Sequence, residues 1–332
     1  MNLFRLTTVR ANTLKLGTCM LLATSASTVA TAQDAFPQRP IRIIVGYSAG
    51  GGNDIIARIV AGRMSEGLGQ PVIIDNKPGA QSIIAAEFVA KSPPDGYTVL
   101  MGPSGPMTIV PATHAKIPYH PLRDFIPLSM IGQFPLLLIV NARSPIKTIQ
   151  ELVAFAKTNP NAANYGSGAA PFQMASELFN LRTGTKFTHI PYKGAGDAAK
   201  AVIANEVLMT IADPAPIAGA IKSGLIRPLA VTSAKRHPSW PDLPTMAESD
   251  IPGMEINIWT GLLVPTGTPA AIVKRLQDEI VRTVRLPDVK QRLEAMGVDP
   301  VGNTSEEYGR IIAADMERWS AVAKAANIKA EQ

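Results

Sequence analysis

The hydrophobic pattern alternates between short apolar runs and longer stretches in which apolar residues recur at helical spacing. The runs are rich in β-branched residues or leucine and predict buried β-strands, whereas the stretches predict helices. We expect strands at 40–45, 71–75, 97–101, 136–140, 187–191, 207–212 and 227–233, and helices that start at Asp54, cover 81–91 and 148–157, and follow Thr304. Repeated strand–helix units indicate largely parallel sheets flanked by helices, which is an α/β fold.

Two helix starts carry a specific signal. Thr148 and Thr304 are each followed three residues later by a glutamate, Glu151 and Glu307. This spacing is the capping box, in which the threonine side chain and the glutamate satisfy each other's free backbone N–H groups.

Proline clusters at 103–135 and again at 238–252, and these breaks bracket a central block of a size suited to one domain. If both breaks are crossovers, the chain passes twice between two lobes. We therefore expect one lobe from 33–134 plus 255–332 and a second lobe from 135–254, hinged around a cleft.

The N-terminal 32 residues have the features of a secretory signal peptide. Three cations precede a short apolar run, and the segment contains no acid. Ala30-Thr31-Ala32 fits a signal-peptidase site, so we expect residues 1–32 to be cleaved from the mature chain. The single cysteine, Cys19, lies in this segment. The mature chain would therefore have no disulfide, no thiolate metal site and no cysteine nucleophile, and we expect it in the periplasm.

Composition narrows the class of protein further. The 332 residues are 46% hydrophobic and carry a net charge of +6, of which three positive charges fall in the first 32 residues, leaving +3 without a basic run. This charge is too small and too dispersed to indicate nucleic acid as a partner. No apolar stretch of about 18 residues is present, so we expect no membrane span.

A glycine-rich loop between the first strand and the first helix allows three readings. It lacks the Lys-Ser/Thr of a P-loop and the spacing of a dinucleotide fingerprint. Residues 46–50 match the G-x-S-x-G elbow of a serine hydrolase with Ser48 as nucleophile, and His189 or His237 with Asp213 could complete a triad. However, only 13 mature residues precede the loop, and an HGGG segment is absent.

The third reading is capture of an anion by backbone N–H groups at the helix start, with Tyr47 and Ser48 adding side-chain contacts. The alternative is a plain turn that Asn53 or Asp54 caps. For Asp54 we favour the cap, because a carboxylate beside an anionic ligand would repel it.

Other candidates follow later strands. Ser104 and Gly105, and in the second lobe Asp213, lie where the crevice of a parallel sheet opens, although Asp213 could instead cap a helix before Pro214. Phe172 either stacks on a ligand or closes an apolar patch. The four histidines show no metal-ligand spacing, so we expect no metal and no cofactor.

A series of motifs, in order, resembles the Bug-type substrate-binding proteins of tripartite tricarboxylate transporters. Each motif is weak alone, but together they extend over essentially the whole mature chain. They are Pro40-x-Arg42 with the glycine loop, Asp54-Ile-Ile-Ala-Arg58, Leu68-Gly-Gln-Pro71, Asp75-Asn-Lys-Pro-Gly79, Pro94-Asp-Gly-Tyr97, Tyr119-x-Pro-x-Arg123-Asp-Phe125, Asn164-Tyr-Gly-Ser167, His189-Ile-Pro-Tyr-Lys-Gly194, Leu229 to Arg236, Pro241-Asp-Leu-Pro-Thr245 and Gly261-Leu-Leu-Val-Pro265.

The resemblance implies a two-lobe, flytrap-like periplasmic binding protein with two crossover strands and no catalytic residues. It would act as a monomer that passes a small carboxylate, whether aromatic, di- or tricarboxylate, to the membrane permease subunits of such a transporter. The positions that match the family's binding loops are Tyr47, Ser48, Ala49, Gly50, Gly51, Asn53, Ser167 and Gly168.

Two departures from the family pattern fall at the expected ligand. Ser48-Ala49 replaces prolines and Gly52 is an extra glycine, while the second-lobe loop is shorter and carries Pro171-Phe172. Phe172 and the shorter loop favour an aromatic or partly apolar carboxylate over citrate.

Overall fold

The computed structural model describes residues 36–192 and 194–328. The expected signal peptide, 1–32, lies outside the described residues. Contacts divide the chain into residues 1–38 and a compact unit, 39–332, which holds all the described helices and strands.

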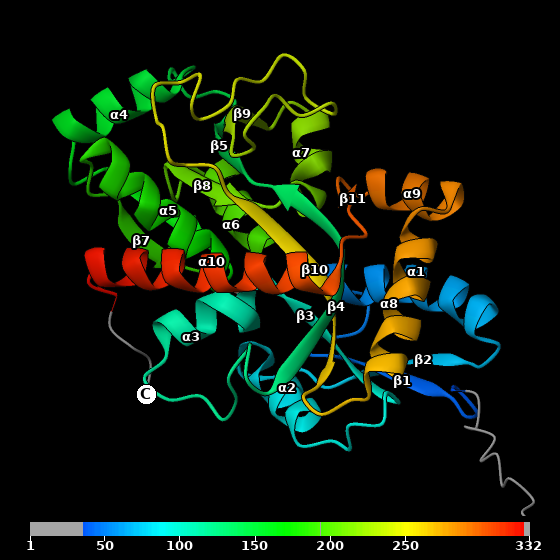
Figure 1. The fold of residues 1–332 in the computed structure, drawn as a ribbon. Coiled ribbons are helices and arrows are strands. Elements are labelled where there is room, and N and C mark those ends of the chain that lie inside the picture. The colour runs from blue at the N-terminus through cyan, green and yellow to red at the C-terminus, as the bar shows by residue number, and fades with distance from the viewer. Residues whose placement is uncertain (1–35, 193, 329–332) are drawn as a thin grey trace, which may run out of the picture. The chain divides into compact units, whose positions relative to one another are not determined.

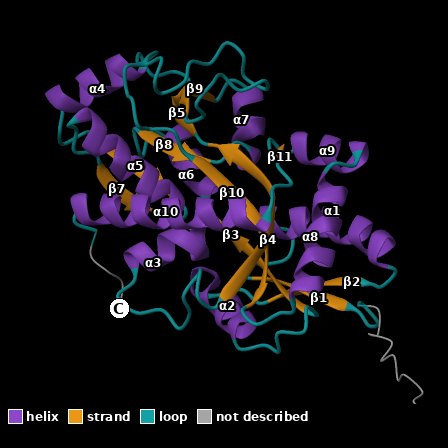
Figure 2. Cartoon of the chain, viewed as in Figure 1, coloured by secondary structure: helices purple, strands orange, loops and turns teal. Residues whose placement is uncertain are grey.

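Helices and strands alternate along this unit (Figures 1 and 2). The strands are β1 (Ile41–Val45), β2 (Val72–Asn76), β3 (Thr98–Pro103), β4 (Phe125–Pro135), β5 (Leu137–Asn141), β6 (Asn164–Ser167), β7 (Thr188–Pro191), β8 (Met209–Ala212), β9 (Ile226–Val231), β10 (Asn257–Pro265) and β11 (Asp299–Pro300). The α-helices are α1 (Gly52–Leu68), α2 (Ile83–Ala90), α3 (Val110–Thr113), α4 (Ile149–Thr158), α5 (Ala170–Thr183), α6 (Ala195–Ile203), α7 (Ala218–Lys222), α8 (Ala270–Val284), α9 (Pro287–Glu294) and α10 (Ser305–Ala325).

The strands form two sheets flanked by helices, as the α/β prediction requires. The first sheet has the order β11-β4-β10-β3-β1-β2, and the second has the order β7-β6-β8-β5-β9. The pairs β1–β2, β1–β3, β6–β7 and β6–β8 are parallel. The pairs made by β4, β5 and β10 are antiparallel, so both sheets are mixed, and the expectation of largely parallel sheets is wrong.

The chain passes between the sheets at two connections, the single residue between β4 and β5 and the segment between β9 and β10. Thr232 joins these connections. Its backbone and hydroxyl bond to Leu136 at 2.9 and 2.8 Å and to Ile256 at 2.9 and 2.6 Å. Strands of the first sheet lie within 41–135, 257–265 and 299–300, and those of the second within 137–231. The lobe boundaries expected from the sequence stay a prediction.

The strand β4 departs from the expected break at 103–135. Its 11 residues include Pro127 and Pro135, and it pairs with β10 over its whole length. Pro127 lies where the register with β10 shifts, and Pro135 ends the strand. Irregular and terminal strand positions tolerate a residue without an N–H group, so these prolines do not end the strand early.

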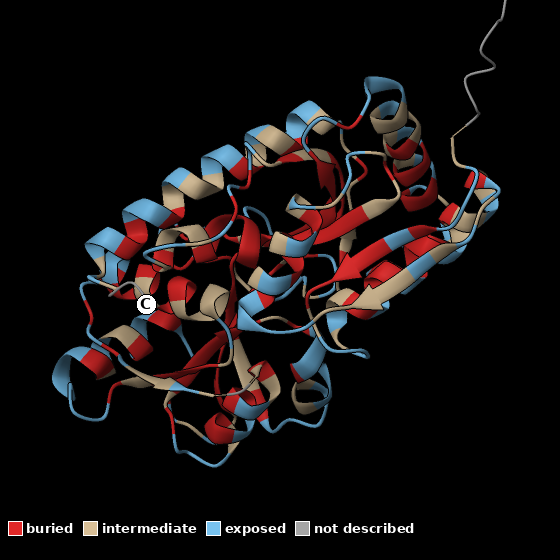
Figure 3. Ribbon diagram, turned by 90° about the horizontal axis from the view of Figure 1, so that it is seen from below, coloured by how far each residue is buried: buried red, intermediate tan, exposed pale blue. Residues whose placement is uncertain are grey.

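Both predicted capping boxes are confirmed and open α4 and α10. The helix α10 reaches the apolar cores of both sheets. Tyr308 and Ile312 pack with first-sheet residues, whereas Trp319, Val322 and Ala323 pack with residues of the second. In Figure 3 the strands are largely buried and the outer faces of the helices are exposed. No helix within the described ranges has the length and apolar character needed to cross a membrane.

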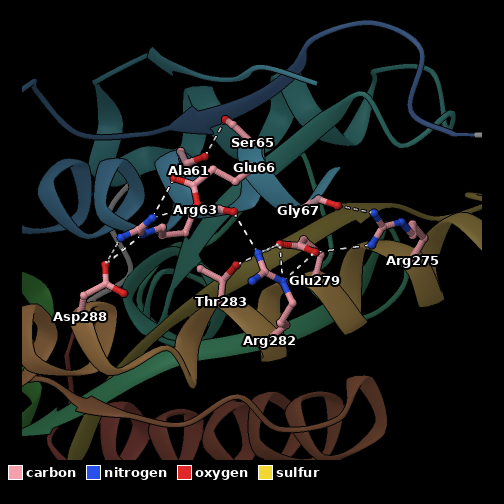
Figure 4. Close-up of polar contacts among 10 residues, drawn as sticks. All are labelled: Ala61, Arg63, Ser65, Glu66, Gly67, Arg275, Glu279, Arg282, Thr283 and Asp288. Carbon is pink, nitrogen blue, oxygen red and sulfur yellow. Dashed lines mark hydrogen bonds and ion pairs between the residues drawn. The ribbon is translucent and has the colours of Figure 1, made fainter. Parts of the chain in front are cut away.

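Ion pairs around the buried Glu279 hold α1 against α8, and a more exposed pair between Arg63 and Asp288 links α1 to α9 (Figure 4). Glu279, 2% exposed, accepts hydrogen bonds from Arg282, Thr283 and Arg275. Those arginines also donate to the carbonyls of Arg63 and Gly67. A Cβ on Gly67 would overlap the Glu279 carboxylate, so glycine makes this close packing of α1 on α8 possible.

Candidate functional site

The glycine loop lies at the carboxyl end of β1, next to the end of β3. Gly50 has a φ of +81°, which is a backbone conformation that favours glycine. At Gly46 a Cβ would overlap Ser82 Oγ, so this position has no room for a side chain. The loop leads into α1, whose N-cap, Gly51, makes no side-chain capping bond.

Asp54 does not cap α1, contrary to the expectation from the sequence. Gly51 occupies the N-cap, and Asp54 lies in the first turn, where it is 1% exposed. Its carboxylate accepts hydrogen bonds from Gly50 N–H at 2.9 Å, Arg58 Nε at 2.8 Å and Asn76 Nδ2 at 2.9 Å. The Arg58 hydrogen bond is the largest cause that lowers the Asp54 pKa to about 2. Asp54 is thus a charged anchor of the loop.

Two of the loop's N–H groups are occupied within the loop itself. Gly50 donates to Asp54, and Gly51 donates to Ser48 O at 3.2 Å. The first backbone bond at the start of α1 runs from Ile55 N to Gly51 O at 3.0 Å. The amides of Gly52, Asn53 and Asp54 precede this bond, so they are first-turn donors without a partner inside α1.

On the second sheet, the parallel strands β6 and β8 bring Ser167, Gly168 and Asp213 to one edge. The Ser167 hydroxyl lies 2.7 Å from His189 Nε2, and the His189 ring stacks on Tyr165 with the centroids 5.0 Å apart. Burial lowers the pKa of His189, which keeps the ring neutral at physiological pH. A Cβ on Gly168 would overlap the backbone of Gly194, so the loops after β6 and β7 are in direct contact.

The first-sheet loops and the start of α5 converge near Tyr47. A Cβ placed on Gly105 would lie 3.5 Å from Tyr47 Oη and 4.0 Å from Pro171 Cγ. Burial raises the pKa of Tyr47, so its hydroxyl stays protonated and able to donate a hydrogen bond. The structure therefore brings Tyr47 and Gly105 together with the loop that follows Ser167 and Gly168.

A pocket of about 140 Å³ lies between the first-sheet elements and the end of β8. It contains the predicted residues Asn53 and Asp213, together with seven residues that were not predicted. The lining is Gly52, Asn53, Ile56, Phe134, Asp213, Pro214, Ala215, Met296 and Val298. It contains no lysine or arginine, so backbone and amide N–H groups are the donors available to an anion.

The two polar side chains of this pocket differ in their partners. Asn53 Oδ1 accepts a hydrogen bond from Thr260 Oγ1 at 3.0 Å, which leaves the amide nitrogen of Asn53 as the donor it offers to the pocket. Asp213 Oδ1 is closed to solvent and accepts no hydrogen bond from the described residues. Burial raises the pKa of Asp213 to about 6.

The alternative role of Asp213 as a helix cap is not observed. Pro214 is the N-cap of the short helix Ala215–Ile217, and that cap makes no side-chain bond. The backbone bond at this turn runs from Ile217 N to Pro214 O at 3.2 Å. Asp213 therefore does not cap this short helix.

Several predicted residues lie outside the pocket lining. Ser48, Ala49 and Gly50 are exposed. Phe172 packs against the apolar cores on both sides of the second sheet, which agrees with the apolar-patch reading of this residue. Ser104 is buried, and its hydroxyl accepts or donates no hydrogen bond within the described residues.

Ser82 and the lining residues Phe134 and Met296 were not found by sequence reasoning. Ala80, Gln81 and Ser82 have positive φ angles of 44°, 51° and 74°, an unusual run for residues other than glycine. Ser82 Oγ lies over Gly46 and, like that of Ser104, has no hydrogen-bond partner in the described part of the chain. Of these features, only the run of positive φ angles after Gly79 depends on neighbouring residues, and no sequence motif marks that run.

A larger cavity of about 330 Å³ lies among α3, α5 and the end of α10. Its acid, Glu177, already accepts hydrogen bonds from Tyr165 Oη at 2.7 Å and Asn180 Nδ2 at 3.2 Å. Because the smaller pocket has the start of α1 and the Asp213 oxygen without a hydrogen-bond donor, it is the stronger candidate site.

The hydrolase reading is not supported. Ser48 is exposed, His189 bonds to Ser167, and His237 Nε2 lies 3.2 Å from Asp299 Oδ1. These contacts place neither histidine with Ser48. The described residues also contain no group of three or more acids, histidines or cysteines that could hold a metal ion.

Comparison with known proteins gives a family match. The family model for the tripartite tricarboxylate transporter family receptor matches residues 56–328. The UPF0065 protein in the tcbD-tcbE intergenic region of Pseudomonas sp. strain P51 is 36% identical over 302 residues, which is 90% of each chain. Protein BugT of Bordetella pertussis is 33% identical over 313 residues, covering 93% of this chain and 96% of BugT.

Solved structures agree with the family match. The Rhodopseudomonas palustris protein Rpa4515 with adipate has a TM-score of 0.81 at 34% identity, covering 89% of this chain and 100% of that one. MatC of the same species, with bound malate, has a TM-score of 0.76 at 28% identity, covering 86% and 99%. The periplasmic binding protein BugD has a TM-score of 0.77 at 29% identity, covering 89% and 100%. The chain therefore belongs to the receptor family of the tripartite tricarboxylate transporters, whose members are substrate-binding proteins rather than enzymes.

Proposed function

We propose that this protein is a periplasmic receptor that captures a small carboxylate between its two sheets and passes it to the permease of a tripartite tricarboxylate transporter. The observation that carries the proposal is the start of α1. Gly52 and Asn53, in the first turn of α1, line the pocket, and the pocket lining has no lysine or arginine. Backbone N–H groups at the start of a 17-residue helix suit a carboxylate better than a neutral or cationic solute.

The ligands of the relatives have the same chemistry. Rpa4515 was solved with adipate and MatC with malate, and both are dicarboxylates. The pocket of this chain combines its polar groups with the apolar side chains of Ile56, Phe134 and Val298. We therefore propose a ligand with a short carbon skeleton and at least one carboxylate at the start of α1.

The remaining parts of the proposal concern location and assembly. Cleavage after Ala32 would release the chain into the periplasm as a monomer, and the binding loops Tyr47–Asn53, Ser104–Gly105 and Ser167–Gly168 would surround the ligand. The division at 134/135 and 254/255 would let the lobes close over it.

A binding panel tests this function. The mature chain, from Gln33, is mixed with dicarboxylates, tricarboxylates, acidic amino acids, benzoate-type acids, neutral sugars and polyamines, and its thermal unfolding is followed. A ligand at about 100 times its Kd adds about 2.7 kcal/mol of stability, which raises Tm by roughly 5–10 °C. A shift with sugars or polyamines alone would contradict a carboxylate receptor.

A further inference from the structure

The pocket is electrostatically asymmetric. One wall is the positive end of the α1 dipole, with the amides of Gly52 and Asn53 and the Asn53 side-chain nitrogen. A second wall includes the acidic residue Asp213, which follows β8. A ligand that presented carboxylates to both walls would be attracted by the first and repelled by the second.

Asp213 Oδ1 differs from the carboxylates of the buried acids Asp54 and Glu279 in having no hydrogen-bond donor among the described residues. Asp54 and Glu279 each accept several hydrogen bonds from arginine and amide or hydroxyl groups. Asp213 Oδ1 is equally closed to solvent, yet none of the described residues donates to it, and the adjacent short helix does not use it as a cap. A buried acceptor without a partner costs free energy, and a donor supplied by a ligand would recover it.

A ligand in the pocket is a source for this donor, because Asp213 is one of the lining residues. The apolar neighbours Ile56, Phe134 and Met296 cannot donate, and Asn53 lies with the α1 amides that suit an anion. The two walls thus suit a single molecule that has a hydrogen-bond acceptor for the α1 amides at one end and a donor for Asp213 at the other.

We propose that Asp213 selects carboxylates that also carry a hydroxyl or ammonium donor, with the carboxylate at the start of α1 and the donor on Asp213. This assignment rests on the proposed carboxylate-binding function and names the class of ligand. Donor-free carboxylates of the same skeleton bind more weakly, because they leave the Asp213 oxygen buried and unpaired.

The test uses acids that share a skeleton and differ only in the donor. Binding of succinate, malate and aspartate, and of glutarate, 2-hydroxyglutarate and glutamate, is measured by calorimetry on the mature chain. The pH is 8, where Asp213 and the ligand carboxyls are ionised. Adipate and benzoate serve as further donor-free acids. We expect the hydroxy or amino acid to bind about tenfold or more tightly than its donor-free partner.

Two variants separate the hydroxyl from the ammonium group. Asp213→Asn keeps an oxygen acceptor but removes the charge, so it retains a preference for a hydroxy acid and loses one for an amino acid. Asp213→Ala removes the acceptor and abolishes both preferences. Asp242→Asn, an exposed aspartate, is the control and leaves all the affinities unchanged.

The outcomes separate this inference from the proposed function. The role of Asp213 is overturned if succinate, glutarate, adipate or benzoate binds as tightly as the hydroxy and amino acids, or more tightly. That result leaves the carboxylate receptor intact. A preference for donors that survives in Asp213→Ala also overturns the role of Asp213. Failure of every acid to bind overturns the proposed function itself, and the inference with it. Circular dichroism of each variant establishes that it is folded.

Discussion

Two aspartates near the proposed site, Asp54 on α1 and Asp213 after β8, show how differently one side chain is used. Asp54 is 1% exposed and accepts hydrogen bonds from Gly50, Arg58 and Asn76. Asp213 has a carboxylate oxygen that is also closed to solvent, but it accepts no hydrogen bond from the described residues.

The partners decide what each carboxylate does. The Arg58 hydrogen bond is the first cause that lowers the pKa of Asp54 to about 2, so Asp54 stays charged and holds the glycine loop. Burial raises the pKa of Asp213 to about 6, so its charged form costs stability. A carboxylate that lowers stability in the free protein can be stabilised by a hydrogen bond from a ligand, whereas a carboxylate that already has its hydrogen bonds cannot.

The largest effect is expected from Asp54→Ala. The substitution leaves Gly50 N–H and Asn76 Nδ2 without their acceptor, and it should lower the free energy of unfolding by about 3 kcal/mol, or Tm by roughly 6–12 °C. Urea unfolding measures the change. Asp278→Ala, which breaks an exposed pair with Lys274, is the control and should cost under about 0.5 kcal/mol. Equal losses of unfolding free energy in Asp54→Ala and Asp278→Ala would show that the hydrogen bonds of Asp54 do not stabilise the fold.

Thr232→Val extends the comparison to an uncharged group. Valine has nearly the same shape but cannot bond to Leu136 N or Ile256 O, and both groups would lose their partner at the two connections between the sheets. We expect a loss of about 2 kcal/mol by urea unfolding. Thr232→Ser keeps the hydroxyl and should recover most of it. A neutral Thr232→Val would mean that these hydrogen bonds do not hold the connections together.

Asp213→Asn should have the opposite sign. A carboxyl whose pKa is raised by folding destabilises the protein above that pKa, and the penalty disappears below the unfolded value near 4. Stability attributable to Asp213 therefore falls as pH rises from about 4 to about 6. At pH 7 the variant should be about 1–2 kcal/mol more stable than the parent, and near pH 4 the two should agree. Urea unfolding at both pH values checks this.

The pH dependence also separates the two aspartates. The pKa of Asp54 is lowered by folding, so its contribution is present above the unfolded value near 4 and is lost as pH falls towards 2. An Asp213→Asn variant that is less stable than the parent at pH 7 would show that Asp213 has a structural partner.

The smallest effect concerns backbone rather than side chain. Ala80 is exposed with a φ of 44°, and glycine adopts this conformation without strain. Ala80→Gly should raise the free energy of unfolding by up to about 1 kcal/mol. The same substitution at the exposed Ala313 in α10 should lower it by about 1 kcal/mol. If both variants lost stability alike, the left-handed segment would carry no strain.

Local patterns were sufficient for most of the individual elements. The strands expected at 40–45, 71–75 and 97–101 appear as β1, β2 and β3 with ends shifted by at most two residues. The capping boxes at Thr148 and Thr304 opened the expected helices, because their hydrogen bonds involve residues only three apart. The sequence pattern did not predict β4, because prolines usually exclude a strand. Its prolines are tolerated at a bulge and at the strand end, and both positions are set by the pairing with β10.

By itself, the sequence determined the α/β class, the glycine loop between a strand and a helix, and the resemblance that the family match confirms. These features depend on periodicity, turn chemistry and short motifs, which neighbouring residues carry. Only the tertiary structure decided that Asp54 is satisfied and Asp213 is not, and that Phe134, Met296 and Val298 meet them at one pocket. Those facts depend on residues up to about 250 positions apart in the chain, and the hydrogen bonds and burial that set a carboxylate's role exist only after the chain has folded.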